Sequence, residues 1–150
     1  GAKKALLQFD LAPVATLSPA QVDRAVLVLW VDAQTNPQEM TLKAYPVTVA
    51  WDAATANWME AAAGMPWTLP GASAAPDDYL TLPMASAPLQ VGRWAVLDVT
   101  DIVKGWLGGT LPNHGLLLTG ESPGAVRYSL GGSLHTQAGA RPALLVESHP

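Results

Sequence analysis

The chain has 150 residues, a formal net charge of −4 and no cysteine. Its length suits one domain with a hydrophobic core, and its 49% hydrophobic content excludes a disordered chain. The few basic residues form no patch that would bind nucleic acid, the absence of cysteine excludes disulfides and thiolate metal sites, and no apolar run approaches the ~20 residues of a membrane span.

The first half of the chain predicts three strands. They cover residues 5–11, 25–31 and 40–49, and the last is interrupted at Pro46, which places that end at a sheet edge or a bulge. The segment 25–31 is apolar at every position. We therefore expect it to be a central strand that is covered on both faces.

The second half begins with a loop-rich stretch and ends in further strands. Residues 71–93 predict loops with one short edge strand at 79–84, and an alternating pattern then predicts a strand at 94–99. Another strand begins at 116, and two more cover 126–130 and 143–147. Thirteen prolines and thirteen glycines fit such a succession of short strands and turns.

A short helix is expected at residues 100–107. Ile102, Trp106 and Leu107 fall on one helical face. Thr100 or Asp101 can cap its start, and Gly108-Gly109 can end it. The apolar face predicts a helix that closes one end of a sandwich. The expected fold is therefore all-β, a single antiparallel jelly-roll-type β-sandwich over residues 1–150 with one short α-helix.

The segment that includes this helix resembles a known family. Asp98-Val99-Thr100, Val103, Trp106-Leu107, Gly109, Asn113 and Gly115 to Leu118 match the pattern D-V-T-x-x-V-x-x-W-L-x-G-x-x-x-N-x-G-L-L-L of DNRLRE-type (disaggregatase-related) domains. These are secreted β-sandwich modules of bacteria and archaea, some of which are classed as carbohydrate-binding. A weaker form of the pattern occurs in the jelly-roll arm of TGF-β-type propeptides.

Other segments extend the resemblance over about residues 4–147. They are L-L-Q-F-D-L at 6–11, the Trp51 to Trp58 segment, M-P-W at 65–67 and R-P-A-L-L-V at 141–146. The Trp51 to Trp58 segment departs from W-x-E-x-x-x-T-W, because Asp52 is followed by alanines and Asn57 replaces the usual Thr.

The family pattern usually has a strand or two before the L-L-x-F-D-L strand, whereas four residues precede the first predicted strand here. We therefore expect either a piece of a longer chain or a sandwich that lacks an edge strand. Upstream sequence or another chain can supply such a strand by strand addition.

No catalytic constellation is apparent, and we expect no enzyme. Gly120-Glu121-Ser122-Pro123-Gly124 fits G-x-S-x-G, but the residue after the serine is proline and lacks the N–H that an oxyanion hole needs. The histidines at 114, 135 and 149 have no metal-ligand spacing. We expect no cofactor, with calcium as the alternative, for which the candidate ligands are Asp52, Asp77 and Asp78.

The six tryptophans are the strongest candidates for ligand binding. Trp30, Trp94 and Trp106 lie on periodic segments and are expected in the core. Trp51, Trp58 and Trp67 lie around a loop-rich segment and either pack a structural corner or stack on a sugar, with Tyr79 and Arg93 as companions. If Trp67 stacks on a sugar, Trp67→Ala weakens binding and leaves the fold intact.

Two functional hypotheses follow. The first is a non-catalytic structural or adhesive module of a secreted or cell-surface assembly or filament, whose partners are copies of itself or neighbouring surface-protein domains. Charged residues make up only 13% of the chain, against roughly 25% in typical domains. This fits buried assembly surfaces, although a thermophilic or high-GC source also explains it. The second, which the family resemblance implies for some members, is a carbohydrate-binding module that recognises a polysaccharide.

Overall fold

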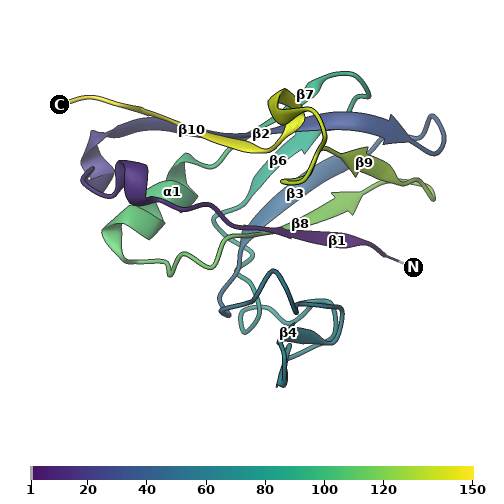
Figure 1. Ribbon diagram of the computed structural model, residues 1–150, viewed down its shortest axis with the longest axis horizontal. Helices are drawn as coiled ribbons and strands as arrows, with labels where there is room; N and C mark the ends of the chain where they lie inside the picture. The colour runs from purple at the N-terminus through teal and green to yellow at the C-terminus, as the bar shows by residue number, and fades with distance from the viewer. Residues whose placement is uncertain (1) are drawn as a thin grey trace.

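A computed structural model describes residues 2–150 (Figure 1). In chain order the strands and the α-helix are β1 Lys4–Leu7, β2 Val22–Gln34, β3 Thr41–Pro46, β4 Glu60–Ala62, β5 Met65–Pro66, β6 Ala85–Pro88, β7 Trp94–Asp98, α1 Thr100–Gly108, β8 Leu116–Glu121, β9 Tyr128–Leu130 and β10 Ala143–Ser148. Short 3-10 turns lie at Ala12–Val14, Pro19–Gln21 and Ala138–Ala140. Within the described residues, no helix has the length and apolarity that a membrane crossing requires.

Two antiparallel sheets face each other. Sheet A has the strand order β1-β8-β3-β6, and sheet B has the order β10-β2-β7, with β9 paired to the far end of β2. The remaining strands, β4 and β5, form a small separate hairpin. In Figure 1 sheet B lies at the top, sheet A lies below it, and the β4–β5 hairpin lies below sheet A.

The strand pairs are nested in the way that defines a jelly roll. β1 pairs with β8, β2 pairs with β7, and β3 pairs with β6, all antiparallel. The β1–β8 and β3–β6 pairs lie in sheet A, and the β2–β7 pair lies in sheet B. Successive pairs therefore alternate between the two sheets. The predicted antiparallel jelly-roll β-sandwich is confirmed. The innermost connection of the roll, between β3 and β6, is residues 47–84.

The main core lies between the sheets, and α1 closes one end of it. Leu27 and Leu29 from β2 pack inside with Leu97 from β7 and Leu116 from β8. Ile102 and Trp106 of α1 belong to the same core, as the helical spacing predicts. The helix ends at Gly109 in the left-handed conformation, which glycine adopts without steric cost.

The predicted helix cap is wrong in detail. Thr100 is the first helical residue and no side chain of the N-cap residue caps the helix. Asp98 instead accepts hydrogen bonds from the Thr100 backbone N–H at 3.0 Å and from its hydroxyl at 2.6 Å. The hydroxyl bond, followed by the backbone bond, holds the pKa of Asp98 below its usual value against the opposing effect of burial.

Several predicted strand limits are corrected by tertiary pairing. β1 ends at Leu7 because its partner β8 begins at Leu116, and the chain beyond is held by Asn113, whose Nδ2 donates to the Phe9 carbonyl at 3.1 Å. β3 ends at Pro46 rather than continuing to residue 49, and it is an inner strand of sheet A, between β8 and β6. The strand expected at 79–84 is absent apart from a single bridge between Tyr79 and Val47, and β6 forms at Ala85–Pro88 instead.

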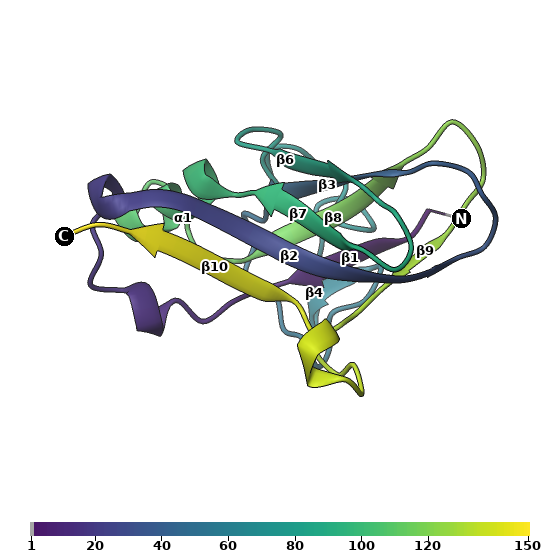
Figure 2. The same cartoon turned by 90° about the horizontal axis from the view of Figure 1, so that it is seen from above.

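Two predictions about the core are wrong. β2 is longer than expected, and its outward-facing side chains are not covered, because no described segment packs on the outer face of sheet B (Figure 2). Trp94 is 44% exposed and Trp30 is half-buried, whereas Trp106 is buried. Of the three tryptophans that were expected in the core, only Trp106 is enclosed.

Candidate functional site

Residues 47–84, called here the excursion, form a small body on the outer face of sheet A. Strand alternation directs Leu6 of β1 and Leu117 of β8 away from sheet B, and Leu6 and Leu117 are paired across the ladder. Val47, Ala61, Trp67 and Ala72 of the excursion pack on Leu117 in a second core. The part of this outer face around Leu6 and Leu117 is therefore apolar for a structural reason, since the excursion packs on it.

Asp78 organises the excursion from inside. Its side chain is 0% exposed, and its two carboxylate oxygens accept hydrogen bonds from the backbone N–H groups of Thr68 at 2.8 Å, Ala74 at 3.0 Å and Leu69 at 3.1 Å. Burial by itself raises the pKa of Asp78, but these hydrogen bonds to the charged form outweigh it, so the pKa lies below its usual value.

Trp67 and Trp51, two of the candidate tryptophans, pack in the second core. Trp67 is 5% exposed, and its indole N–H donates to the Asn57 carbonyl at 3.0 Å. Trp51 is half-buried, and its indole N–H donates to the His114 carbonyl at 2.6 Å. Trp67 joins two parts of the excursion, and Trp51 joins the excursion to the segment before β8. Both therefore pack a structural corner, which was one of the two alternatives for them.

Trp58 differs from them because 48% of it is exposed. The Lys4 ammonium lies 5.9 Å from the centre of its ring, within the range of a cation–π interaction. Lys4 also donates to the Gly71 carbonyl at 2.8 Å and to the Ser73 hydroxyl at 2.9 Å. Burial lowers the pKa of Lys4, and the charge of Asp78 partly opposes this.

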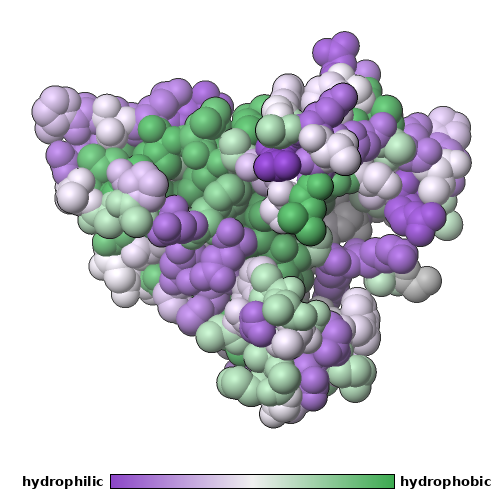
Figure 3. Space-filling model, in the orientation of Figure 1, coloured by the Kyte–Doolittle hydropathy of each residue, from purple (hydrophilic) through white to green (hydrophobic). Residues whose placement is uncertain are grey.

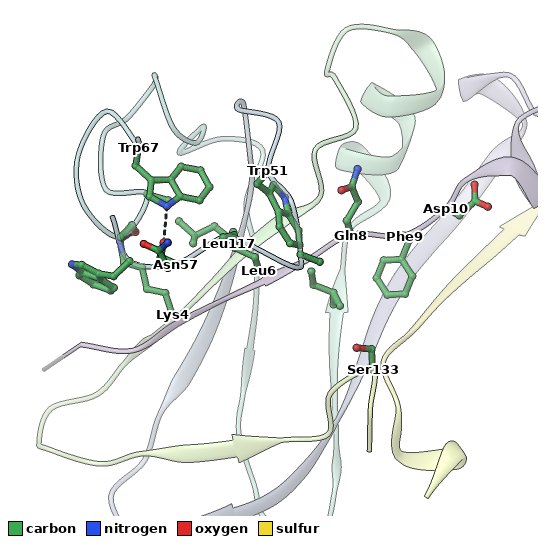
Figure 4. Close-up of a pocket in the computed structure, with 16 residues that line it drawn as sticks. Lys4, Leu6, Gln8, Phe9, Asp10, Trp51, Asn57, Trp67, Leu117 and Ser133 are labelled. Carbon is green, nitrogen blue, oxygen red and sulfur yellow. Dashed lines mark hydrogen bonds between the residues drawn. The ribbon is translucent and has the colours of Figure 1, made fainter. Parts of the chain in front are cut away.

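A cavity of about 860 Å³ lies where β1 meets the excursion (Figure 4). Trp51, Trp58 and Trp67 line it on the excursion side, and Lys4, Gln8 and Asp10 line it from β1 and its continuation. In Figure 4 the β1 backbone runs along the cavity from Lys4 toward Asp10, and Ser133 lies across from it. The cavity therefore follows the side of β1 that no described strand pairs with.

The structure brings only some of the predicted site residues together. Tyr79 lies in the second core beside Tyr45, with ring centres 5.2 Å apart, and does not line the cavity. Arg93 lies in the turn before β7, in the other sheet, so its expected place beside the tryptophans is wrong. Sequence patterns missed Lys4, Gln8 and Asn57, because nothing in a strand pattern shows which residues meet the excursion.

The calcium candidates do not form a cation site. Asp78 uses both oxygens for backbone N–H groups, and Asp52 accepts from the Ala54 N–H at 3.0 Å and the Thr55 hydroxyl at 2.8 Å. These bonds, with that to Ala54 the largest effect, hold the pKa of Asp52 below its usual value. Asp77 is exposed, and among residues 2–150 no three His, Cys, Asp or Glu side chains cluster in a way that suits a metal ion.

The residues of the apparent nucleophile motif have a structural explanation. The Ser122 hydroxyl donates to the Glu39 carbonyl at 2.6 Å and accepts from the Gly124 N–H at 3.4 Å. His114 contributes its backbone carbonyl to the indole N–H of Trp51. Gly120 and Glu121 thus end β8, and Ser122-Pro123-Gly124 form the bend that follows it.

Comparison with known proteins adds no relative. No protein-family model matches the chain, and no curated protein matches its sequence. The resemblance to DNRLRE-type domains stays a prediction.

Proposed function

We propose that this chain is a non-catalytic structural or adhesive module of a secreted or cell-surface assembly, and that it joins its neighbours along the open side of the sandwich. On this side sheet A ends in β1 and sheet B ends in β10, each paired with one described strand only. The partners are further copies of the chain or neighbouring domains.

The observation that carries the proposal is the apolar seam between these two edges. Leu7, Phe9 and Leu11 contribute to it from β1 and its continuation, and Leu144 and Val146 contribute from β10. All five pack against the main core but remain partly exposed. Figure 3 shows the hydrophobic surface that lies between β10 and β1.

Two cavities adjoin β1. The first follows Lys4 to Asp10, and a second, of about 780 Å³, is lined by Ala2 to Ala5 together with Leu118 and with Leu130 of β9. An extended strand beside β1 would direct alternate side chains to opposite faces of sheet A. One cavity lies toward the excursion and the other opens between the sheets, so each can receive one set of those side chains. Strand addition at an open edge supplies backbone hydrogen bonds together with such side-chain pockets.

The first test is the oligomeric state of the purified chain by light scattering and negative-stain imaging over a range of concentrations. We expect ordered polymers or concentration-dependent association. Phe9→Lys charges the seam and should reduce association. Leu134→Lys places a charge at a 92% exposed position next to Ser133, which lines the first cavity together with the seam residues Leu7 and Phe9, so it should reduce association without affecting folding.

Ala63→Lys, on an exposed tip of the excursion, is the matched control and should associate like the native chain. A chain that remains monomeric at every concentration contradicts the proposal. So does equal association of the native chain and both seam variants.

A second candidate function is binding of a polysaccharide in the first cavity. It is favoured by the exposed face of Trp58 beside the polar side chains of Lys4, Gln8 and Asn57. Affinity electrophoresis against a panel of polysaccharides tests it. Retention should be lost in Trp58→Ala and kept in Met59→Ala, whose exposed side chain does not line the cavity. Absence of retention on every polysaccharide removes this candidate.

A further inference from the structure

The outer face of sheet B is a continuous apolar surface. In the ladder Trp30 is opposite Trp94, Val28 is opposite Val96, and Val26 is opposite Leu145 of β10. These six side chains point away from the core, because their neighbours along each strand, such as Leu27, Leu29 and Leu97, are buried inside. They form what is called here the B face.

Solvent reaches the B face directly. Val96 is 45% exposed and Leu145 is 53% exposed. Trp30 and Trp94 meet edge to face with ring centres 5.3 Å apart, which fixes two large side chains at one end of the surface. Figure 2 looks onto β10, β2 and β7, and no described segment crosses them. Contiguous apolar surfaces of this kind commonly mark interaction sites.

The charges around the B face follow a rule. β2 carries outward-facing charges of opposite sign near its two ends, and β7 and β10 each have an outward-facing acidic residue near one end and an exposed arginine in the segment before the other. Asp23, beside Arg24, pairs with His149. β2 has Arg24 and Asp32, the β7 segment has Asp98 and Arg93, and the β10 segment has Glu147 and Arg141. The register places Arg24, Asp98 and Glu147 at one end and Asp32, Arg93 and Arg141 at the other.

This charge pattern is complementary to itself in one orientation. If a second copy is stacked face to face and related by a two-fold axis that runs across the strands, β2 lies antiparallel on β2. Arg24 then meets Asp32 of the second copy, Asp98 meets its Arg93, and Glu147 meets its Arg141. A two-fold axis along the strands would instead place Arg24 on Arg24 and Asp98 on Glu147, so like charges would meet.

We propose that the B face is a two-fold interface between two copies of this chain, packed with their β2 strands antiparallel. The apolar side chains form its centre and the six charges form its rim, and the sheets stack about 10 Å apart as in other sandwiches of sheets. This interface is separate from the seam between β1 and β10 and goes beyond the function proposed above. A chain with both contacts has two independent ways to join its neighbours.

The size of the B face predicts a reversible dimer. Three strands at a spacing of about 4.8 Å and roughly nine residues in length cover about 14 by 30 Å. This is less than the ~800 Å² per partner of a standard stable interface. Dissociation should therefore be measurable in the micromolar to millimolar range.

The test is sedimentation velocity across that range, on a Phe9→Lys background that suppresses contacts through the seam. Val96→Glu places a charge at the centre of the B face and should abolish the dimer. Arg24→Glu and Asp32→Arg should each weaken it by about tenfold or more, because the two-fold axis repeats every change. The double variant Arg24→Glu/Asp32→Arg restores opposite charges in both contacts and should recover the native affinity to within about threefold.

The pair Glu147→Arg/Arg141→Glu is a second charge exchange that should behave in the same way, and Glu147 is itself the partner of Arg24 across the β2–β10 ladder. It matters because Arg24 also lies near Asp98 within its own chain. Lys43→Glu, on the outer face of sheet A, is the control and should leave the dimer unchanged. Thermal melting shows whether each variant is folded.

The proposal is overturned if the Phe9→Lys chain is monomeric to millimolar concentration, if Val96→Glu leaves the dimer intact, or if neither double exchange restores what its single changes lose. Failure here leaves the seam proposal standing, since that one is judged on the native chain and its seam variants. Conversely, if the native chain and the seam variants form the same dimer through the B face and no larger assembly, the seam proposal fails and the B-face proposal stands.

Discussion

The Asp78 carboxylate accepts a hydrogen bond from the backbone N–H of Ala74, four residues before it, at 3.0 Å. The same carboxylate accepts from Thr68 and Leu69. A single buried side chain thus satisfies three backbone donors of a loop that has little regular structure of its own. The shape of the excursion depends on this charge more than on its strands, since β4 and β5 have only three and two residues.

Asp78→Asn should destabilise the excursion. The amide nitrogen of Asn cannot accept the hydrogen bonds that one carboxylate oxygen takes from Leu69 and Ala74, and each buried donor left without a partner costs about 1–3 kcal/mol. Amide hydrogen exchange of residues 67–79 measures this loss. Unchanged protection in the variant would show that the excursion is held by its apolar contacts alone.

The excursion should also loosen in acid. The pKa of Asp78 is lower in the folded chain than its unfolded value of about 4. The carboxylate therefore stabilises the fold above the unfolded pKa, and this stabilisation is lost as the pH falls through the folded pKa. Tryptophan fluorescence against pH measures it. In Asp78→Asn this part of the acid transition should disappear, with Asp98→Asn as a comparison that affects the start of α1.

Trp67→Ala should lower stability rather than act only on binding, contrary to the expectation from sequence. Trp67 is buried in the second core, and truncation of a buried tryptophan costs about 3–5 kcal/mol. Trp58→Ala, at a half-exposed site in the same loop, should cost much less. Urea denaturation of the two variants makes the comparison, and equal losses would show that burial does not separate their roles.

Trp106→Ala should destabilise the main core by about 3–5 kcal/mol, because Trp106 holds α1 against the sheets. Trp106→Phe should cost far less. The Trp106 Nε1 is buried and has no hydrogen-bond partner among the described residues, so its removal breaks no bond and relieves a desolvated donor. Thermal melts of both variants test this. A Phe variant as unstable as the Ala variant would indicate that the indole shape is essential.

Gly115→Ala should destabilise the junction of β1 and β8. Gly115 has a φ of +75°, and a Cβ there would overlap the Leu7 carbonyl oxygen and lie 2.9 Å from the Gln8 Cα. Gly109→Ala is the matched control, because its φ is +74° but its Cβ would meet nothing within 4 Å. The control should lose only the conformational cost of about 1–2 kcal/mol. If both variants melt at the same temperature, the close approach to β1 is not a constraint.

Sequence patterns sufficed where neighbours along the chain carry the information. The alternating pattern predicted β7 to within one residue, since the strand expected at 94–99 covers Trp94–Asp98, and the spacing of Ile102 and Trp106 predicted the buried face of α1. These are properties of periods of two and 3.6 residues, which local geometry imposes. The number and length of such elements predicted an all-β fold, and the family resemblance implied its jelly-roll type.

Local patterns could not decide what the pairing of distant segments decides. The end of β1 at Leu7 depends on where β8 begins, and the replacement of a strand at 79–84 by β6 depends on the ladder with β3. The roles of Trp51 and Trp67 were left open because their indole N–H groups donate to backbone carbonyls 63 and 10 residues away in the sequence. The role of Trp58 was left open because its ring meets Lys4, from the start of the chain. Arg93 was misplaced because its turn belongs to sheet B.

The sequence by itself determined that this chain forms short strands around an apolar core with one helix at its end, since the hydrophobic period of each element depends only on residues that are neighbours in the sequence. Only the tertiary structure decided which apolar side chains are enclosed. Val28 and Leu27 are neighbours of nearly equal hydrophobicity, yet Leu27 is buried between the sheets and Val28 lies on the open B face. The physical reason is that burial depends on what packs against each face of a sheet. A strand that is apolar on both faces does not specify whether the segment that covers its second face belongs to its own chain.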